Sequence, residues 1–261
     1  QKDHINALPD FDVDTMSNEA LLSALLDRHG PGRVIFRNTR SAMSGFPKRV
    51  AHLVSLQPDN DEDSWQERAR LEFASESCVG DPVEAYDFKR DPRIIWLGDF
   101  IQDRGGEKAL LICSSKEKAL ALEEAIRVSI AVKCAVFHED LTLVQRDRNA
   151  AWFAEEDGAQ LLVCSEIGSE GRNFQFVHHL VLFDLPLNPE LLEQRIGRLD
   201  RIGQKSTIHL HVPYLGGSPV EVLAQWYHEG LDAFEHNLLG ANELMQEFGE
   251  EVLEICSTPS G

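Results

Sequence analysis

Short apolar runs separated by longer segments of mixed polarity dominate the sequence after residue 90. An apolar run that does not alternate with polar residues indicates a strand with both faces buried. The expected strands cover residues 109–113, 134–138, 160–164, 180–184 and 207–213. Apolar residues at helical spacing predict helices at residues 92–104, 116–128, 142–153, 189–196 and 219–236. This alternation predicts an α/β fold with a parallel sheet covered by helices on both faces.

The first ninety residues show a different pattern. Residues 1–57 are polar, then helical, then basic, and end in an extended apolar stretch, so we interpret them as a connecting segment. Residues 58–90 are acidic with little periodicity and predict a linker that holds at most one helix. Residues 91–236 form the predicted α/β domain, and residues 237–261 the start of a following region.

The net charge of −19 argues against a nucleic-acid-binding protein, but the distribution of the charge changes this picture. Residues 31–57 contain five basic side chains and no acidic one, and a second basic group lies at residues 195–205. Residues 206–261 contain nine acidic side chains and neither Lys nor Arg. The two basic groups are therefore candidates for nucleic-acid contact, whereas the acidic end suits either solvent or a protein partner.

Several other classes of protein are disfavoured. The sequence has no run of eighteen apolar residues, so we expect no membrane span. The five cysteines lack a C-x-x-C pair and are expected to be buried apolar residues in a reducing cytosol. The histidines lack ligand spacing, and adjacent His178 and His179 are not expected to reach one site from a strand, so we predict no metal site. The sequence also lacks the G-x-S-x-G elbow of serine hydrolases.

Polar residues follow the expected strands. Ser114 and Ser115 come after the strand at 109–113, His138 ends the next strand, and Ser165 follows the strand at 160–164. In open parallel sheets, ligands bind outside the carboxyl ends of the strands. We therefore expect one edge of the sheet to be the ligand-binding surface. The structural alternative for His138 is a hydrogen-bonded histidine at a strand end.

The strongest motif runs from Gln194 to Gln204 and reads Q-R-x-G-R-x-x-R-x-G-Q. It places Arg198 and Arg201 three residues apart, and paired guanidinium groups are suited to binding a transferring phosphoryl group. A basic turn at a helix end is the alternative. The sequence has no phosphate loop of the form G-x-x-x-x-G-K-[ST] and no strand that ends in an Asp-Glu magnesium pair. The arginines therefore indicate one half of an active site.

A second motif precedes this run by about twenty residues. Residues 165–175 read S-E-I-G-S-E-G-R-N-F-Q, and the two glycines let the backbone approach a ligand closely. Weaker blocks lie at residues 108–127 and 138–153. In order and spacing, these blocks resemble the second RecA-like lobe of Swi/Snf-related superfamily 2 helicase-like ATPases, particularly bacterial members associated with RNA polymerase. The resemblance covers residues 33–236.

The resemblance implies a RecA-like three-layer lobe, with the end of a first lobe within residues 1–57. The whole protein would hydrolyse ATP with Mg²⁺ between two lobes, move along double-stranded DNA and remodel or recycle RNA polymerase in transcription. It would be cytoplasmic and nucleoid-associated. The missing first lobe would be a partner and would bind most of the ATP and Mg²⁺, so we expect this chain alone to be inactive.

The resemblance also implies roles for individual residues. By this resemblance, the catalytic residues are Gln194, Arg198 and Arg201, and the residues that bind the nucleotide are Glu170, Gly171 and Asn173. The nucleic-acid contacts are Ser114, Ser115, His138, Ser165, Ser169, Arg37 and Arg40.

Two alternatives stay open. The acidic region at residues 206–261 also fits a non-catalytic module that binds RNA polymerase. The second lobe of an RNA helicase is a further possibility, because the sequence does not decide between duplex and single strand. The polymerase surface and the oligomeric state are likewise not determined by the sequence.

Overall fold

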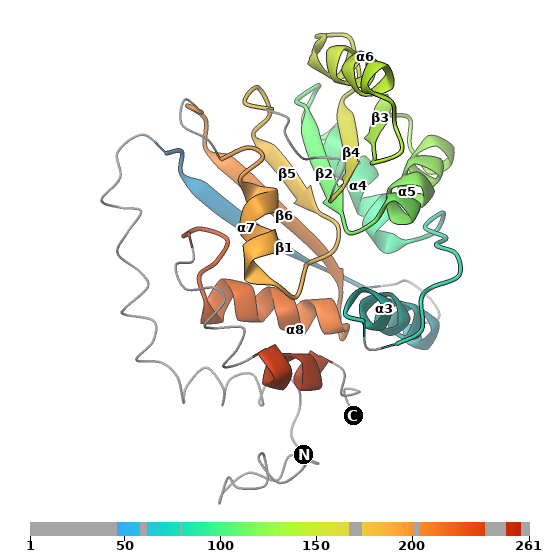
Figure 1. The fold of residues 1–261 in the computed structure, drawn as a ribbon, viewed down its shortest axis with the longest axis vertical. Coiled ribbons are helices and arrows are strands. Elements are labelled where there is room, and N and C mark those ends of the chain that lie inside the picture. Colours follow the sequence, from blue (N-terminus) through green and yellow to red (C-terminus); the bar gives the residue numbers. More distant parts are fainter. Residues whose placement is uncertain are drawn as a thin grey trace, which may run out of the picture.

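The computed structural model describes residues 46–57, 62–78, 80–166, 174–200, 204–237 and 249–256. Its centre is a six-stranded sheet in the order β1-β6-β5-β2-β4-β3, in which every neighbouring pair is parallel (Figure 1). The strands are β1 (Arg49–Leu56), β2 (Ala109–Cys113), β3 (Cys134–Phe137), β4 (Leu161–Ser165), β5 (His179–Leu182) and β6 (Ile208–Leu215).

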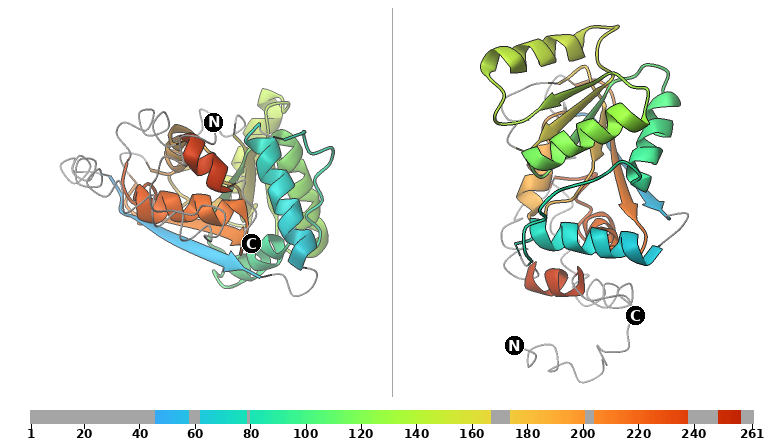
Figure 2. Two further views of the ribbon diagram at one scale, coloured as in Figure 1. Left: turned by 90° about the horizontal axis from the view of Figure 1, so that it is seen from below. Right: turned by 90° about the vertical axis from the view of Figure 1, so that its right-hand side faces the viewer.

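Helices cover both faces of this sheet (Figure 2). They are α3 (Glu62–Glu76), α4 (Pro92–Gln102), α5 (Lys116–Ser129), α6 (Leu143–Ala154), α7 (Pro189–Ile196), α8 (Pro219–Gln225) and the π-helix η1 (Trp226–Gly230), followed by a helix at residues 249–256. None of these helices is long and apolar enough to cross a membrane.

Successive residues of β2 enter two different cores. Leu110 and Ile112 pack into the core beneath α6, α7 and α8, whereas Leu111 and Cys113 pack into the core beneath α4 and α5. All four side chains are fully buried. Because side chains alternate across a strand, a central strand between two helix layers must be apolar throughout. The predicted α/β fold with helices on both faces of a parallel sheet is therefore confirmed.

Two elements of this architecture come before residue 91. Strand β1 pairs with β6 from Arg49 opposite Ile208 to Leu56 opposite Leu215. Helix α3 packs against α8 and β6 (Figures 1 and 2) and buries Phe73. The sheet and its helices thus extend into segments that the sequence indicates as connector and linker. The apolar periodicity that would predict α3 from the sequence is weak, because carboxylate side chains occupy much of the helix face that points inward.

The predicted closing helix at residues 219–236 is shorter in the structure. Helix α8 continues into η1, where the N–H of Leu231 bonds the carbonyl of Trp226, and the helix ends at Gly230. Asp232 then adopts a left-handed backbone with φ 54°. A left-handed residue cannot continue a right-handed helix, so the chain turns here.

Four histidines stack across the amino-terminal halves of β1, β5 and β6. His52 Nε2 lies 3.0 Å from His209 Nδ1, and His179 Nδ1 lies 3.0 Å from His211 Nε2. Burial lowers the pKa of His179 to about 4 and that of His211 to about 2. Both of these rings are therefore neutral at pH 7.

The expectation that His178 and His179 do not reach one site is wrong. The adjacent His178 and His179 do reach the same group, because their Nε2 atoms lie 3.8 and 2.8 Å from Glu107 Oε2. Strand β5 begins at His179, so His178 stands before the strand and does not follow its strict alternation. Adjacent side chains point to opposite faces only within a regular strand.

We expect Gly158→Ala to destabilise the protein. A Cβ atom on Gly158 would lie 1.8 Å from the backbone carbonyl oxygen of Trp152, a contact that only a backbone shift can relieve. Overpacking of this kind costs about 1–3 kcal/mol in free energy of unfolding. Urea unfolding measures the change, and Glu156→Ala at an exposed neighbouring position is the control. Equal stability of the two variants would contradict the predicted clash.

Candidate functional site

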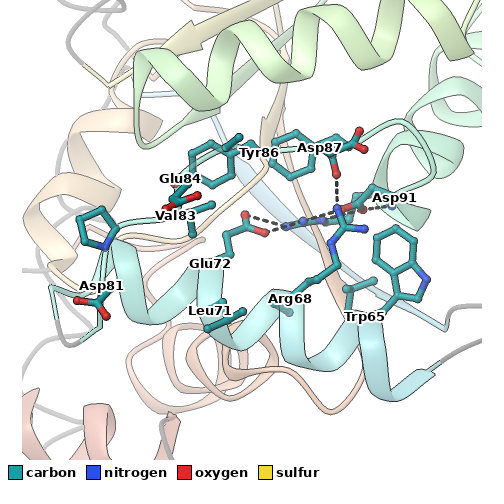
Figure 3. Close-up of a pocket in the computed structure, with 16 residues that line it drawn as sticks. Trp65, Arg68, Leu71, Glu72, Asp81, Val83, Glu84, Tyr86, Asp87 and Asp91 are labelled. Atoms are coloured by element: carbon teal, nitrogen blue, oxygen red, sulfur yellow. Dashed lines mark hydrogen bonds and ion pairs between the residues drawn. The ribbon is translucent and has the colours of Figure 1, made fainter.

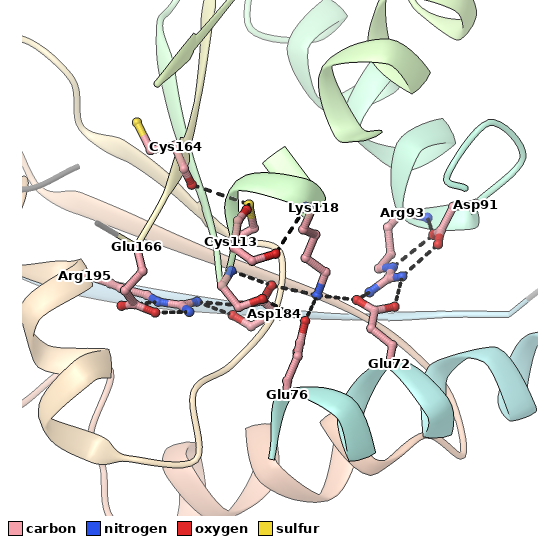
Figure 4. A network of polar contacts seen from close by, with 12 residues as sticks. Glu72, Glu76, Asp91, Arg93, Cys113, Lys118, Cys164, Glu166, Asp184 and Arg195 are labelled. Atoms are coloured by element: carbon pink, nitrogen blue, oxygen red, sulfur yellow. Dashed lines mark hydrogen bonds and ion pairs between the residues drawn. The ribbon is translucent and has the colours of Figure 1, made fainter. Parts of the chain in front are cut away.

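A network of buried charges lies at the carboxyl edge of the sheet (Figure 4). Its centre is Lys118, in the first turn of α5, whose side chain is fully buried. The ammonium group donates to Asp184, which follows β5, at 2.8 Å. It also pairs with Glu72 and Glu76 on α3. A buried ammonium group needs such partners, because an unpaired charge away from water is very costly.

Glu72 connects Lys118 to a second cation. Arg93 Nη2 donates to Glu72 at 2.9 Å and to Asp91 at 2.7 Å. Asp91 also caps α4 by accepting the backbone N–H of Arg93 at 2.9 Å. Burial alone would raise the pKa of Glu72, but Arg93 and Lys118 outweigh burial and hold this pKa at about 2. Glu72 is therefore ionised at neutral pH.

The pKa of Glu76 differs from that of Glu72, one turn earlier on the same helix. Burial raises the pKa of Glu76 to about 7, and the nearby charges of Asp184 and Glu72 act in the same direction, against the attraction of Lys118. A local excess of acid adds to the effect of burial, since three carboxylates surround one ammonium group. Glu76 also accepts a hydrogen bond from Ser114 Oγ at 2.8 Å.

Arg195 clamps the other side of Asp184. Its Nη1 donates to Asp184 Oδ1 and to the Asp184 carbonyl, each at 2.8 Å. Its Nε and Nη2 donate to the two oxygens of Glu166 at 3.0 and 2.7 Å. The planar guanidinium thus joins the ends of β4 and β5 to α7, and this bidentate geometry is specific to arginine.

The turn after α7 is fixed by a second arginine. Arg49, at the start of β1, donates to both oxygens of Glu193, at 2.9 and 2.6 Å, and also pairs with buried Asp200. Arg195 and Asp200 therefore hold the two ends of the segment that contains Arg198. The motif residues between them are placed by ion pairs rather than by a flexible loop.

Two of the three predicted catalytic residues are described, and they differ in exposure. Gln194 is exposed and Arg198 is half-buried. The Nε of Arg198 is buried and has no hydrogen-bond partner among the described residues. A buried guanidinium N–H with no partner among the described residues is a donor available to an anion, and this observation fits a phosphate group beside the turn after α7.

The four predicted nucleic-acid contacts that the structure describes lie at strand ends, and three of them have hydroxyl groups with partners within the protein. Ser114 donates to Glu76, Ser115 accepts from Lys118 N as the N-cap of α5, and Ser165 donates to Glu139 at 2.8 Å. The Nδ1 of His138 is buried without a hydrogen-bond partner in the described part of the chain.

The other predicted site residues lie outside the described residues. These are Arg201, Glu170, Gly171, Asn173, Ser169, Arg37 and Arg40.

A cavity of about 350 Å³ adjoins the network between α3 and the segment at residues 81–91 (Figure 3). Trp65 and Arg68 stand on one wall, with the Arg68 guanidinium 4.5 Å from the Trp65 ring centre. Arg68 also donates to the carbonyl of Asp87, so the α3 side chains hold this segment in place. Glu72 and Arg93 line the same cavity and connect it to the network.

Sequence reasoning missed the roles of Lys118, Asp184 and Arg195. Asp184 carried a signal, since it directly follows an apolar strand. Lys118 carried a weaker one, because it stands four residues before buried Leu122 and so shares the inward face of α5. Arg195 lies inside the strongest motif but precedes the arginine pair on which the motif is centred. Its carboxylate partners come from distant segments that the sequence does not connect.

We expect Lys118→Met to lower the free energy of unfolding by about 3–5 kcal/mol, because it leaves buried carboxylates without their cation. Lys116→Met, two residues earlier on α5, removes an exposed pair with Asp140 and should leave stability nearly unchanged. Chemical denaturation of the two variants measures the difference. Similar stabilities would show that the buried pairs do not hold this edge together.

Stability should fall as the pH rises from about 4.5 to about 7, because over this range Glu76 ionises in the unfolded chain but stays protonated in the folded protein. The stabilisation from the raised pKa of Glu76 is fully present below 4.5 and is lost once the pH exceeds about 7. Glu76→Gln stays neutral at every pH. Its free energy of unfolding should therefore rise by more than about 1 kcal/mol relative to that of the unmodified protein as the pH increases from 5 to 8.

The control for this comparison is Glu67→Gln, an exposed position on the same helix. Denaturant unfolding at several pH values measures both variants. A parallel pH dependence for Glu76→Gln and the unmodified protein would rule out ionisation of Glu76 as the cause.

Comparison with known proteins agrees with this architecture. The helicase conserved C-terminal domain matches residues 92–203, and the RNA polymerase recycling family C-terminal region matches residues 207–260. A solved structure described as the Sulfolobus solfataricus SWI2/SNF2 ATPase core in complex with dsDNA aligns with a TM-score of 0.53 and 15% identity. It covers 80% of this chain and 50% of that one, and it supports the RecA-like fold alone.

Curated relatives are much more similar in sequence. The RNA polymerase-associated protein RapA of Pseudomonas putida strain GB-1 is 51% identical over 249 residues, and that of Pseudomonas fluorescens strain Pf0-1 is 52% identical over 249 residues. Each alignment covers 94% of this chain but only 26% of the relative, so the chain spans about a quarter of their length. Over 94% of its length the chain is therefore similar to RapA proteins, and it contains matches to a helicase conserved C-terminal domain and to the RNA polymerase recycling family C-terminal region.

Proposed function

We propose that this chain works as the second RecA-like lobe of an ATP-dependent translocase on double-stranded DNA that remodels or recycles RNA polymerase. The observation that carries the proposal is Arg198, whose buried Nε lacks a partner in the described part of the chain. It stands in a segment that ion pairs fix on both sides. A guanidinium N–H that is held in this way, with no partner among the described residues, is suited to a phosphate group.

Each motif residue has a part in this proposal. Arg198 and Arg201 stabilise negative charge on the transferring phosphoryl group, with Gln194 exposed beside them. Arg195 and Asp184 hold α7 so that the arginines keep their direction. Glu170, Gly171 and Asn173 shape the nucleotide side of the preceding loop.

ATP with Mg²⁺ supplies the phosphoryl group whose transfer drives the motion. A first lobe with a phosphate loop binds most of this nucleotide, and this chain has no such loop. Closure of the two lobes then brings the arginines into the site. The chain without that lobe is therefore inactive in ATP hydrolysis.

The nucleic-acid side of the proposal rests on the strand ends and the basic segment. Ser114, Ser115, His138 and Ser165 stand at or after the carboxyl ends of strands, where a tracked backbone would pass, and Ser169 follows Ser165 in the sequence. Arg37 and Arg40 add positive charge beside it. The buried Nδ1 of His138, which lacks a partner among the described residues, is available to a phosphate oxygen.

A second candidate function is a non-catalytic surface for RNA polymerase. It is favoured by the match of residues 207–260 to the RNA polymerase recycling family, in the region that contains no Lys or Arg. This region includes β6, which pairs with both β1 and β5. A polymerase contact there would be joined directly to the sheet that carries Arg198, so the two functions are compatible.

The test is Arg198→Ala and Arg201→Ala in a protein of the relatives' full length that carries this chain. Each variant should lower DNA-stimulated ATP hydrolysis by about 10³–10⁵-fold, the range for a catalytic arginine, and should leave polymerase binding intact. Hydrolysis is measured as phosphate release, with duplex DNA, single-stranded DNA or RNA as the stimulating strand.

Arg127→Ala is the matched control, because this arginine is exposed in the last turn of α5, at the amino edge of the sheet. Unchanged hydrolysis in Arg198→Ala and Arg201→Ala would refute the catalytic role. Loss of polymerase binding together with hydrolysis would favour the interaction module, and stimulation by RNA instead of duplex DNA would favour an RNA helicase lobe.

A further inference from the structure

A group of imidazole and carboxylate side chains lies at the amino edge of the sheet, opposite the charged network. Glu107 stands just before β2, and His178 and His179 stand at the start of β5. The register of the sheet explains their meeting, because Ala109, the first residue of β2, pairs with His179. None of these three residues belongs to the helicase motifs, and none is used in the proposed function.

The three side chains converge on one point. His179 Nε2 lies 2.8 Å from Glu107 Oε2, and His178 Nε2 lies 3.8 Å from the same oxygen. One ligand atom from each residue lies within 4.8 Å of the other two. In a tetrahedral zinc site with bonds of about 2.0–2.1 Å, ligand atoms are about 3.3 Å apart, so small side-chain rotations complete the geometry.

A second layer of contacts orients the buried ligand. His179 Nδ1 lies 3.0 Å from His211 Nε2, so an Nδ1–H of His179 that donates to His211 leaves the Nε2 lone pair directed at Glu107. Phe100 meets both rings edge-on, with centroid distances of 5.9 and 4.5 Å. Metal-binding histidines are held in this way, with the second ring nitrogen engaged in a hydrogen bond.

We propose that Glu107, His178 and His179 bind one divalent transition-metal ion, with zinc as the best-matched ion. Two imidazole nitrogens and one carboxylate oxygen form a ligand set that zinc accepts, with the fourth position left to water. The sequence alone indicated no metal site, because it did not predict that the two adjacent histidines share a target. Glu107 and His178 are 50% and 32% exposed in their side chains, so an ion enters from solvent.

The bound ion would join the segment before β2 to the start of β5. These two strands are hydrogen-bonded neighbours at the centre of the sheet. The role is structural, because the site contains no group of the helicase motifs. Zinc binding should therefore raise the melting temperature of the chain.

The experiment uses the 261-residue chain without an affinity tag, stripped of metal and titrated with Zn²⁺ against a chromophoric chelator. We expect one tight equivalent and an upward shift in melting temperature. Glu107→Gln and His178→Asn should each weaken zinc binding by about 100-fold or more, since each removes a ligand. His211→Gln should weaken it by about 10–100-fold through the orientation of His179.

His236→Asn is the matched control, because His236 forms a comparable pair with Asp232 at 2.8 Å on the surface. It should bind zinc like the unmodified chain. Glu107 is exposed, so Glu107→Gln is expected to fold, and circular dichroism checks this before titration. The proposal is overturned if the unmodified chain binds no stoichiometric zinc, or if Glu107→Gln binds it with unchanged affinity.

Discussion

The buried ammonium group of Lys118 is the constraint on which the carboxyl edge depends. A charge with no access to solvent must be compensated by partners, and those partners come from two separate parts of the chain. Helix α3 supplies two carboxylates, and the end of β5 supplies Asp184. The position of α3 across the sheet is therefore set by electrostatics as well as by apolar contact.

The same network also determines how the arginine motif is presented. Asp184 is shared between Lys118 and Arg195, so the first turn of α5 and the last turn of α7 are linked through one carboxylate. Arg49 holds the following turn through Glu193 and Asp200. Functional side chains on rigid elements keep their geometry better than those on mobile loops. The half-buried Arg198 is an example of such placement.

The fold was predictable from the sequence because β2 and β4 are uninterrupted apolar runs, and such runs have few other interpretations. The specific spacing of Gln194 and Arg198 singles them out as candidate site residues, and their role stays a prediction. Lys118 was not predictable as a buried residue, since a helical lysine is by default a solvated side chain. The inward face of α3 was hidden for the same reason, because Glu72 and Glu76 look like surface residues until their cations are known. His178 and Glu107 come together through the register of β2 and β5, and the sequence alone does not reveal that register.

The order of the strands has a consequence for synthesis of the chain. Among the described strands, β1 pairs with β6 alone, and β6 comes last of them along the chain, so Arg49 and Ile208 are far apart in sequence. Strands β2, β3 and β4 can associate before β6 has been synthesised. Strand β1 must wait unpaired until β6 has emerged, so the earliest of the described strands is among the last to be incorporated. Closing such a long loop late in folding is entropically costly and slow.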